Sequence, residues 1–333
     1  MFTKLIAPHS EAEIKKHWKY TDNVYISVLC PCFNQENYIR DAIESFLAQE
    51  CEYSFEIIVH DDASTDSTPE ILKAYQARFP TIIKLVLQTE NQYSQGKQIS
   101  AIAASHAQGE YLALCEGDDF WIDNKKIQKQ MDVLNVNQQY NICITKAIAL
   151  YPDNTTVFFC DLGNAIRYLS FDFCIEGPKK DFFPTASFFI RKKIFENLPE
   201  WFFTDAPVGD YYLQICAAES NGCIYLPYPT TIYRRDSLGS WMSNRRKSDL
   251  FMEAKRRINT SFKIKEMLAM KHHKTLARRL GNNYLPLYCR NFFEVNYSEV
   301  DISIIIKVIV QYPTSIYWFV RYLIIRIFNK RLW

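Results

Sequence analysis

The sequence lacks several patterns that define other classes of protein. It contains only 9 glycines in 333 residues, and none of its 10 cysteines forms the CxxC pair of zinc or dithiol sites. The GxxxxGK[ST] phosphate-binding loop and the GxSxG turn of α/β-hydrolases are also missing. These absences argue against a zinc-ribbon protein, a P-loop NTPase and a serine hydrolase.

A long uncharged apolar run is missing as well. The most apolar segment is interrupted by Lys307, Pro313, Arg321 and Arg326. No run therefore reaches the roughly 20 residues that span a bilayer. Residues 1–19 are charged and have no apolar core of signal-peptide length. Ten cysteines without such a signal predict a protein of the reducing cytosol, in which cysteine acts as a small apolar residue.

Charge is distributed unevenly, although the formal net charge is only +2. Residues 1–243 carry 21 Lys and Arg against 31 Asp and Glu, a net charge of −10. Residues 244–333 carry 18 against 6, a net charge of +12. A basic tail indicates nucleic acid, a phospholipid surface or a solvated helical face. Because residues 244–280 lack interleaved aromatic residues that would stack on bases, we expect no nucleic acid.

Residues 302–333 have the composition of a helix that lies in the headgroup region of a membrane. Tyr317, Trp318 and Tyr322 are amphipathic aromatic residues, and Lys330 and Arg331 follow them. A buried pair of C-terminal helices would be equally apolar, so both interpretations are open. The prediction is a cytoplasmic protein, peripheral on an anionic membrane at the inner face of the cell.

Strand-like and helix-like segments alternate over the first third of the chain, which predicts βαβ units and a parallel sheet. The expected strands are 25–30, 55–60, 82–87, 111–115, 141–150, 155–160, 186–190 and 230–234. The expected helices are 36–48, 68–78, 96–107 and 208–219. The expected parts are an N-terminal extension (1–23), an α/β domain (24–243, with halves 24–135 and 136–243) and a basic helical region (244–333).

Acidic residues gather where two of the expected strands end. Asp61 and Asp62 follow the second strand, and Glu-Gly-Asp-Asp at 116–119 follows the fourth. Ligands of parallel sheets bind beyond the carboxyl ends of the strands. Three carboxylates in four residues repel one another unless a cation or solvent relieves the charge. The pattern therefore predicts either a divalent-cation site for a diphosphate or a solvated acidic loop.

Four segments, taken in order, resemble the family 2 inverting glycosyltransferases, which have the GT-A fold. They are Ile26 to Asn34 (ISVLCPCFN), Phe55 to Asp66 (FEIIVHDDASTD), Gly109 to Tyr111 (GEY) and Glu116 to Asp119 (EGDD). Phe120-Trp121 and KIQKQ at 126–130 further resemble bacterial cell-surface polysaccharide transferases. The resemblance covers roughly residues 24–241. It implies a Rossmann-like α/β fold, with a mostly parallel sheet flanked by helices and a basic helical C-terminal extension.

The implied reaction moves a sugar from a nucleoside-diphosphate sugar, typically UDP-linked, to a hydroxyl of a glycan or polyprenyl-linked acceptor. Mn²⁺ or Mg²⁺ would hold the diphosphate. Two other classes stay open. A non-catalytic GT-A-like binding module would suit the departures from the family pattern at Glu116 and Gly209. A nucleotidyltransferase would need a Gly/Arg-rich loop that residues 31–37 do not supply. A processive synthase is disfavoured because its QxxRW pattern is missing.

The resemblance also implies which residues bind the donor: Pro31, Phe33, Asn34, Asp61, Asp62, Lys97, Asp118 and Arg234. Phe33 would border and stack on the nucleotide base, and Asp62 would accept a hydrogen bond from it. Lys97 would replace an arginine that the family carries before its third helix. Arg234 would face the donor phosphates, although an arginine on a strand also forms ordinary surface ion pairs.

Asp119 matches the family's metal-bound carboxylate, and Asp118 and Asp236 are further candidate ligands. Asp236 stands where the related pattern has a histidine, and it could still supply an oxygen. Glu116 stands where an aspartate is usual. Its longer side chain leaves direct contact with the metal open.

Inverting transfer needs a general base that takes the proton of the acceptor hydroxyl. Asp210 matches that residue, with Asp205 as the alternative in the same segment. Asp210 could instead cap the helix that follows. Tyr211 and Trp121 are candidates for binding the acceptor, and Trp121 could equally be a core residue.

Overall fold

The computed structural model describes residues 2–178, 182–207, 209–219, 221–237, 247–286, 288 and 302–328. The chain folds into two compact units. Unit 1 comprises Met1–Pro199 and Gly209–Asn244, and unit 2 comprises Glu200–Val208 and Arg245–Trp333. The N-terminal residues 1–23 fall in unit 1 and residues 200–208 in unit 2. The division into parts expected from the sequence stays a prediction.

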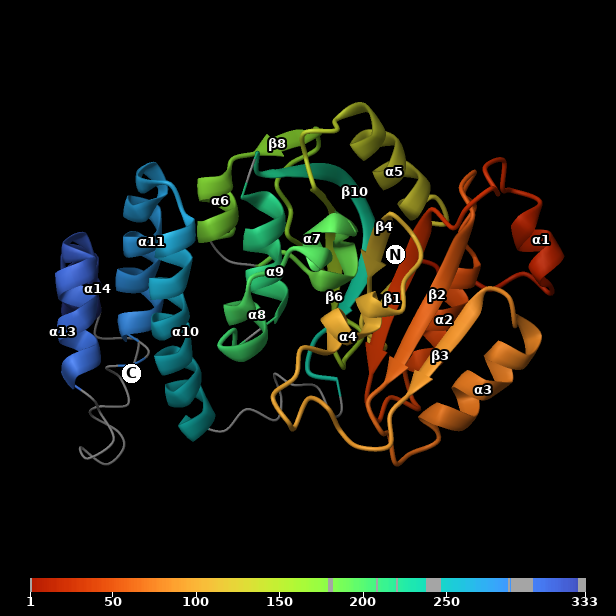
Figure 1. The fold of residues 1–333 in the computed structure, drawn as a ribbon, viewed down its shortest axis with the longest axis horizontal. Coiled ribbons are helices and arrows are strands. Elements are labelled where there is room, and N and C mark those ends of the chain that lie inside the picture. The colour runs from red at the N-terminus through yellow and green to blue at the C-terminus, as the bar shows by residue number, and fades with distance from the viewer. Residues whose placement is uncertain are drawn as a thin grey trace. The chain divides into compact units, whose positions relative to one another are not determined.

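A ten-stranded sheet forms the centre of unit 1 (Figure 1). Its strands are β1 (Ile26–Cys32), β2 (Phe55–Asp61), β3 (Ile83–Leu87), β4 (Tyr111–Leu114), β5 (Phe120–Trp121), β6 (Ile142–Leu150), β7 (Thr156–Phe159), β8 (Arg167–Leu169), β9 (Phe189–Arg191) and β10 (Cys223–Arg234). Their main order is β3-β2-β1-β4-β9-β6-β10-β5, while β7 pairs with β6 and β8 with β10.

The sheet is parallel where the βαβ pattern predicted it. β1 pairs in parallel with β2 and β4, and β2 with β3. All seven residues of β2 are buried, as expected for a strand covered on both faces. In the second half, β9, β7, β8 and β5 run antiparallel to their neighbours, while β10 is parallel to β6. The fold class predicted from the sequence, a mostly parallel α/β fold of the GT-A type, is confirmed.

Helices cover the sheet of unit 1. They are α1 (Glu11–Lys15), α2 (Ile39–Leu47), α3 (Thr68–Arg78), α4 (Ile99–Ser105), α5 (Lys126–Val136), α6 (Phe171–Glu176), α7 (Lys193–Glu196) and α9 (Gly209–Ala218). α2 and α3 pack against each other, and α4 packs on β1 and β2 (Figure 1). The sequence analysis did not predict α5, in which the polar Lys126 and Gln130 are buried together with Ile127, Met131 and Leu134.

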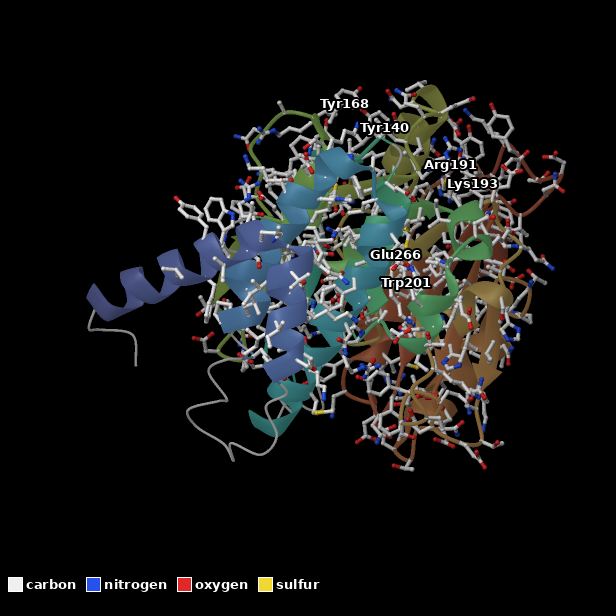
Figure 2. All side chains as sticks on the ribbon, turned by 60° about the vertical axis from the view of Figure 1, so that its left-hand side comes forward. Tyr140, Tyr168, Arg191, Lys193, Trp201 and Glu266 are labelled. Carbon is white, nitrogen blue, oxygen red and sulfur yellow. The ribbon has the colours of Figure 1, made fainter. Side chains whose placement is uncertain are left out.

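Arg191, at the end of β9, joins three elements of this unit. Its guanidinium donates to the Tyr111 hydroxyl at 2.6 Å and to the Leu134 carbonyl at 2.8 Å. A third hydrogen bond, from Nε, reaches the Tyr140 carbonyl at 3.0 Å. The Tyr140 ring in turn lies 5.5 Å from that of Tyr168 (Figure 2). These contacts fix the antiparallel half of the sheet against α5.

Unit 2 is helical, as the sequence predicted for residues beyond 245. Its α-helices are α8 (Glu200–Thr204), α10 (Lys247–Met267), α11 (His273–Arg279), α13 (Ile302–Gln311) and α14 (Pro313–Phe328). Of the helices described, none is by itself long and apolar enough to cross a membrane. One bent pair of helices is long and apolar enough when its two parts are counted together. Its parts are Ser303–Gln311 and Pro313–Val320, and the bend between them is 111°.

The helices α13 and α14 are apolar on two faces. Val308 and Tyr312 are buried, and the Tyr312 hydroxyl donates to the Ser261 carbonyl of α10 at 2.7 Å. Val310 and Tyr317, in contrast, are 72% and 60% exposed. One face is therefore core, as one interpretation of the sequence held, while another faces solvent. Lys330 and Arg331 lie outside the described residues, as does the side chain of Tyr322.

Candidate active site

The acidic residues 116–119 form a loop between β4 and β5, which we call the acid loop. The Asp119 amide donates to the Glu116 carbonyl at 3.0 Å and closes the turn. Gly117 donates to the Pro31 carbonyl at 3.0 Å. A Cβ atom on Gly117 would clash with the Gln35 side chain and lie 2.8 Å from the Cys32 Cβ. Only glycine lets the acid loop lie this close to the end of β1.

Two residues from the end of β10 hold the acid loop in place. The Arg234 amide donates to Asp119 Oδ1 at 2.8 Å, and its guanidinium donates to the Asp118 carbonyl at 2.5 Å. The Ser237 hydroxyl donates to Asp118 Oδ2 at 3.1 Å. The Arg234 guanidinium also pairs with Asp41 of α2. The acid loop is thus bound to β10 and, through Arg234, to α2.

The environment of the acid loop disfavours negative charge. Burial and the charges of Asp118 and Asp210 raise the pKa of Glu116 to about 8. Burial, together with the charges of Asp118 and Glu116, raises the pKa of Asp119 well above its usual value. Burial also raises the pKa of Asp118. The prediction that these carboxylates repel one another agrees with these shifts, and a cation would relieve the repulsion.

The donor chemistry of the acid loop fits Mn²⁺ or Mg²⁺. Both cations take oxygen ligands, and at diphosphates they are commonly held by one or two carboxylates plus phosphate oxygens. Within the described part of the chain, no three His, Cys, Asp or Glu side chains are arranged to hold a metal by themselves. Asp118 and Asp119 are the carboxylates that would hold the cation together with a diphosphate.

Asp236 is more remote from this arrangement than its neighbours. Its side chain is exposed and its backbone has φ of 54°, while Ser237 points to the acid loop. Arg234 is engaged with Asp41 and the loop backbone. Roles of Asp236 as a ligand and of Arg234 at the donor phosphates therefore stay predictions. The structure gives Arg234 a role that the sequence did not predict, because its hydrogen bonds hold the acid loop in position.

Asp210 lies at the start of α9, next to the acid loop. Its Oδ2 accepts a hydrogen bond from the Thr185 hydroxyl at 3.4 Å, and its Oδ1 accepts one from the Tyr211 amide at 2.6 Å. Thr185 also hydrogen-bonds Glu116, and the charge of Asp210 contributes to the raised pKa of Glu116. Thr185 therefore links the two acidic groups. The capping contact and a catalytic role are compatible.

Asp205, the alternative base, belongs to unit 2. Its carboxylate forms an ion pair with Lys263 of α10 at 2.6 Å and accepts a hydrogen bond from Thr204 at 2.6 Å. The side-chain hydrogen bond from Lys263 is the main reason why its pKa is lowered. This ion pair makes the Asp205 carboxylate a weaker proton acceptor than an ordinary aspartate.

The predicted donor residues at the ends of β1 and β2 are joined by hydrogen bonds. Asn34, with φ of 52°, accepts from the Thr65 amide at 2.8 Å. Its own amide donates to the Ser64 hydroxyl at 2.8 Å, and that hydroxyl donates to Asp61 at 2.5 Å. Phe33 is 43% exposed beside this network, so its ring is accessible to a base. Pro31 is the last residue but one of β1.

Asp62 anchors the loop that follows β3. Its two carboxylate oxygens accept from the amides of Gln92 at 2.8 Å and Tyr93 at 3.0 Å. Each carboxylate oxygen has a second lone pair, so a contact with a base stays a prediction. Lys97 is exposed and donates to the Gln92 side chain at 2.5 Å. Asp62 and Lys97 thus meet at one loop.

The prediction that Trp121 binds acceptor sugars is wrong. The side chain has no exposed surface, and its Nε1 donates to the Ala186 carbonyl at 3.0 Å. The ring lies 4.6 Å from that of Phe46, and the Lys126 ammonium is 4.3 Å from its centroid. Burial lowers the pKa of Lys126 to about 7. Trp121 is a core residue, as the other interpretation of the sequence held.

Tyr211 is half-buried, and its hydroxyl donates to the Ile175 carbonyl at 3.0 Å. Its role toward an acceptor stays a prediction. Sequence reasoning missed Asp41, Thr185 and Ser237, which contact the proposed functional residues from elsewhere in the chain. Asp41 and Thr185 lie in no recognisable motif, whereas Ser237 directly follows Asp236 in a segment that the resemblance did cover.

Comparison with known proteins shows which family this chain resembles. The family model described as "Glycosyl transferase family 2" matches residues 27–198. The uncharacterized protein Rv1520 of Mycobacterium tuberculosis is 34% identical over 219 residues, which is 66% of this chain and 61% of the relative. The teichoic acid biosynthesis protein GgaA of Bacillus subtilis is 28% identical over 120 residues, 35% of this chain and 26% of that protein. The match thus spans less than two thirds of either relative.

Two solved structures share the fold. TarS (residues 1–349) of S. aureus, in complex with UDP-GlcNAc, gives a TM-score of 0.59 at 16% identity, covering 88% of this chain and 81% of that one. Mannosyltransferase PcManGT from Pyrobaculum calidifontis, in complex with GDP-Man and Mn²⁺, gives 0.55 at 16% identity, covering 96% and 94%.

The fold, with an acid loop at the carboxyl end of a parallel strand, defines a GT-A type α/β protein. The family model covers more than half of the chain. This chain belongs to glycosyl transferase family 2.

Proposed function

We propose that this protein is an inverting glycosyltransferase that moves a sugar from a UDP-sugar to a hydroxyl of a glycan or lipid-linked acceptor in surface polysaccharide synthesis. The observation that carries the proposal is the convergence of the acid loop with Asp210. Glu116 and Asp210 come from distant parts of the sequence, yet both contact Thr185. The acid loop, which would bind the diphosphate through a cation, and Asp210, which would accept the proton, therefore lie in one site.

The chain's own residues supply three functions in this proposal. Asp118 and Asp119 hold a divalent cation, which when bound neutralises the diphosphate leaving group. Arg234 and Ser237 keep the acid loop in the conformation that presents these carboxylates. Asp210 takes the proton of the acceptor hydroxyl as that hydroxyl attacks the anomeric carbon. Attack from the face opposite the leaving group inverts the configuration.

Relatives and structural neighbours support the choice of substrates. TarS was solved with UDP-GlcNAc and PcManGT with GDP-Man and Mn²⁺, which favours a nucleotide-sugar donor and a divalent cation. The relation to a teichoic acid biosynthesis protein favours a surface glycan as the product. The raised pKa values in the acid loop favour a cation site, because a cation would offset the like charges that contribute to them.

Donor binding tests this proposal directly. The purified protein should bind UDP in the presence of Mn²⁺, and EDTA should weaken that binding at least tenfold, because the carboxylates alone repel a diphosphate. Calorimetric titration with UDP, GDP and CDP measures the affinity, and slow release of the nucleoside diphosphate from each sugar donor identifies the substrate. Failure of all three nucleotides to bind with Mn²⁺ would contradict the proposal.

We further propose that unit 2 holds the enzyme on an anionic membrane surface. Val310, Tyr317 and other apolar residues of α13 and α14 face solvent. Residues 302–333 contain 5 Lys and Arg and no Asp or Glu. Apolar side chains bordered by basic ones match the boundary between acyl chains and anionic headgroups. The proposed location is the cytoplasmic face of the membrane.

Vesicle binding tests the membrane proposal. The double variant Val310→Ser and Tyr317→Ser should bind phosphatidylserine-containing vesicles roughly tenfold or more weakly, because two exposed apolar side chains no longer enter the bilayer. Val136→Ser is the matched control, since Val136 of α5 in unit 1 is 80% exposed. Co-sedimentation at low and high salt measures binding. Equal binding of the double variant and wild type, or binding indifferent to phosphatidylserine, would refute the proposal.

A further inference from the structure

The first residues of the chain lie on unit 1, outside the part that the family model matches. The Phe2 ring is 5.7 Å from that of Phe120, and Lys4 Nζ is 2.7 Å from Asp41 Oδ2. The Ala7 amide donates to Glu44 Oε2 at 2.5 Å. We call residues 2–7 the N-terminal strap. These contacts reach Phe120 of β5 and two acidic residues of α2.

The contact at Asp41 connects the strap to the acid loop. The same oxygen, Oδ2, that accepts from Lys4 also pairs with the Arg234 guanidinium. Arg234 in turn binds the Asp118 carbonyl with its side chain and Asp119 Oδ1 with its amide. A single carboxylate therefore separates the strap from the arginine that holds both proposed metal ligands.

A second connection runs through Phe120, the residue after Asp119. The Phe120 ring has no exposed surface, because the Arg234 guanidinium lies 4.5 Å from its centroid and the Phe2 ring and Lys4 ammonium cover it as well. The strand β5 has only two residues, paired with β10. A strand of two residues is stabilised little by its backbone hydrogen bonds. Its position therefore depends on the side chains that pack on Phe120.

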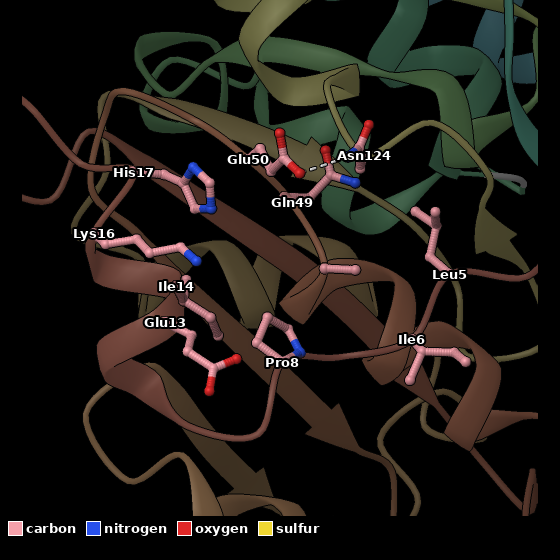
Figure 3. Close-up of a pocket in the computed structure, with 11 residues that line it drawn as sticks. Leu5, Ile6, Pro8, Glu13, Ile14, Lys16, His17, Gln49, Glu50 and Asn124 are labelled. Carbon is pink, nitrogen blue, oxygen red and sulfur yellow. Dashed lines mark hydrogen bonds between the residues drawn. The ribbon is translucent and has the colours of Figure 1, made fainter.

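The strap is held by few contacts. Past Lys4, the side chains of Leu5, Ile6 and Pro8 border a pocket of about 250 Å³ beside Gln49 and Asn124 (Figure 3). Ile6 is 81% exposed, so its side chain adds little to the packing of this stretch on unit 1. Ion pairs as exposed as Lys4–Asp41, in which Lys4 is 55% exposed, contribute little to global stability. Substitutions in the strap should therefore release it without unfolding the protein.

We propose that the N-terminal strap positions the acid loop, with Lys4 and Phe2 as positioning residues that act through Asp41, Arg234 and Phe120. The inference rests on the proposed function in that the loop binds a cation and a nucleotide. When the strap is bound, Lys4 holds the Asp41 carboxylate and Phe2 packs on the Phe120 ring. Arg234, which contacts both Asp41 and Phe120, is then held in one orientation. When the strap is released, the acid loop samples conformations in which Asp118 and Asp119 no longer converge.

The experiment compares four forms of the full-length protein: wild type, the double variant Phe2→Ala and Lys4→Ala, Lys4→Arg, and Lys16→Ala. Lys16, an exposed lysine of the same N-terminal extension, is the matched control for loss of charge. Hydrogen exchange measures the amides of Asp119, Trp121 and Ile122, which donate bonds of 3.0, 3.0 and 2.8 Å. Titration with Mn²⁺ at fixed UDP measures the site, and thermal unfolding measures the fold.

In the double variant, exchange at these three amides should rise about tenfold, while amides of β1 and β2 keep their rates. The Mn²⁺ concentration for half-maximal UDP binding should rise about fivefold to tenfold, with a thermal midpoint within about 2 °C of wild type. Lys4→Arg and Lys16→Ala should behave as wild type does. Unchanged exchange in the double variant, or faster exchange across the whole of unit 1, would overturn the inference. If the wild-type protein fails to bind UDP but the double variant still shows faster exchange in the acid loop, the proposed function is wrong. The inference that the strap positions the acid loop would then still hold.

Discussion

Asp119→Asn is expected to abolish turnover and to weaken Mn²⁺-dependent UDP binding at least tenfold, because it removes one of two carboxylates that would hold the cation. Asparagine keeps an oxygen for the Arg234 amide, which alanine would not. The loop conformation should therefore persist. Because the pKa of Asp119 is raised by burial and by like charge, its neutralisation should leave the metal-free protein as stable as wild type or more so.

Asp132→Ala is the control for this experiment, since Asp132 is an exposed carboxylate on α5. Calorimetry with UDP, with and without EDTA, separates loss of the metal from loss of the nucleotide. Thermal unfolding in EDTA tests the stability. If Asp119→Asn bound UDP in Mn²⁺ as tightly as wild type, Asp119 would not be a metal ligand.

Asp210→Asn should lower kcat by roughly 10²–10⁴ while the affinity for the donor stays near that of wild type. The amide keeps the size of the side chain and can still accept from the Tyr211 amide, but it cannot take a proton. A change confined to capping would alter stability and leave kcat alone. Steady-state kinetics with a saturating acceptor, alongside UDP titration, distinguishes these outcomes.

The matched variant Asp205→Asn removes the alternative base. It should lose the ion pair with Lys263, which lies partly in solvent, and keep most of the activity. The reverse pattern, an active Asp210→Asn and an inactive Asp205→Asn, would assign the base to unit 2 and not to the start of α9.

The parts of the fold that the sequence predicted well are those with local signals. β1, β2 and α3 are continuous runs of apolar or periodic residues, and α3 begins and ends at the predicted residues. α6 and β8 gave no comparable signal, because they have only six and three residues. α5 was missed because two of its buried positions are the polar residues Lys126 and Gln130. In the second half, the sequence predicted strands at 141–150, 155–160, 186–190 and 230–234, but not that β7 and β9 pair antiparallel to their neighbours.

The candidate site follows the same rule. The acid loop could be found because its carboxylates are contiguous and follow a buried strand. Trp121 was misjudged, since a residue next to a ligand loop can point either way and only packing decides. Asp41 and Thr185 could not be predicted, because nothing in the residues around them indicates that the fold brings Asp41 to Arg234 and Thr185 to Glu116.

The distance along the chain between the acid loop and β10 has a consequence for how the protein is made. Asp119 and Arg234 are 115 residues apart, and their contact forms only after the intervening chain has closed. During synthesis the family motifs of β1, β2 and β4 leave the ribosome long before Arg234 does. A nascent chain can therefore complete its parallel core while the acid loop still lacks the residues that hold it. Catalytic competence is acquired late in biogenesis.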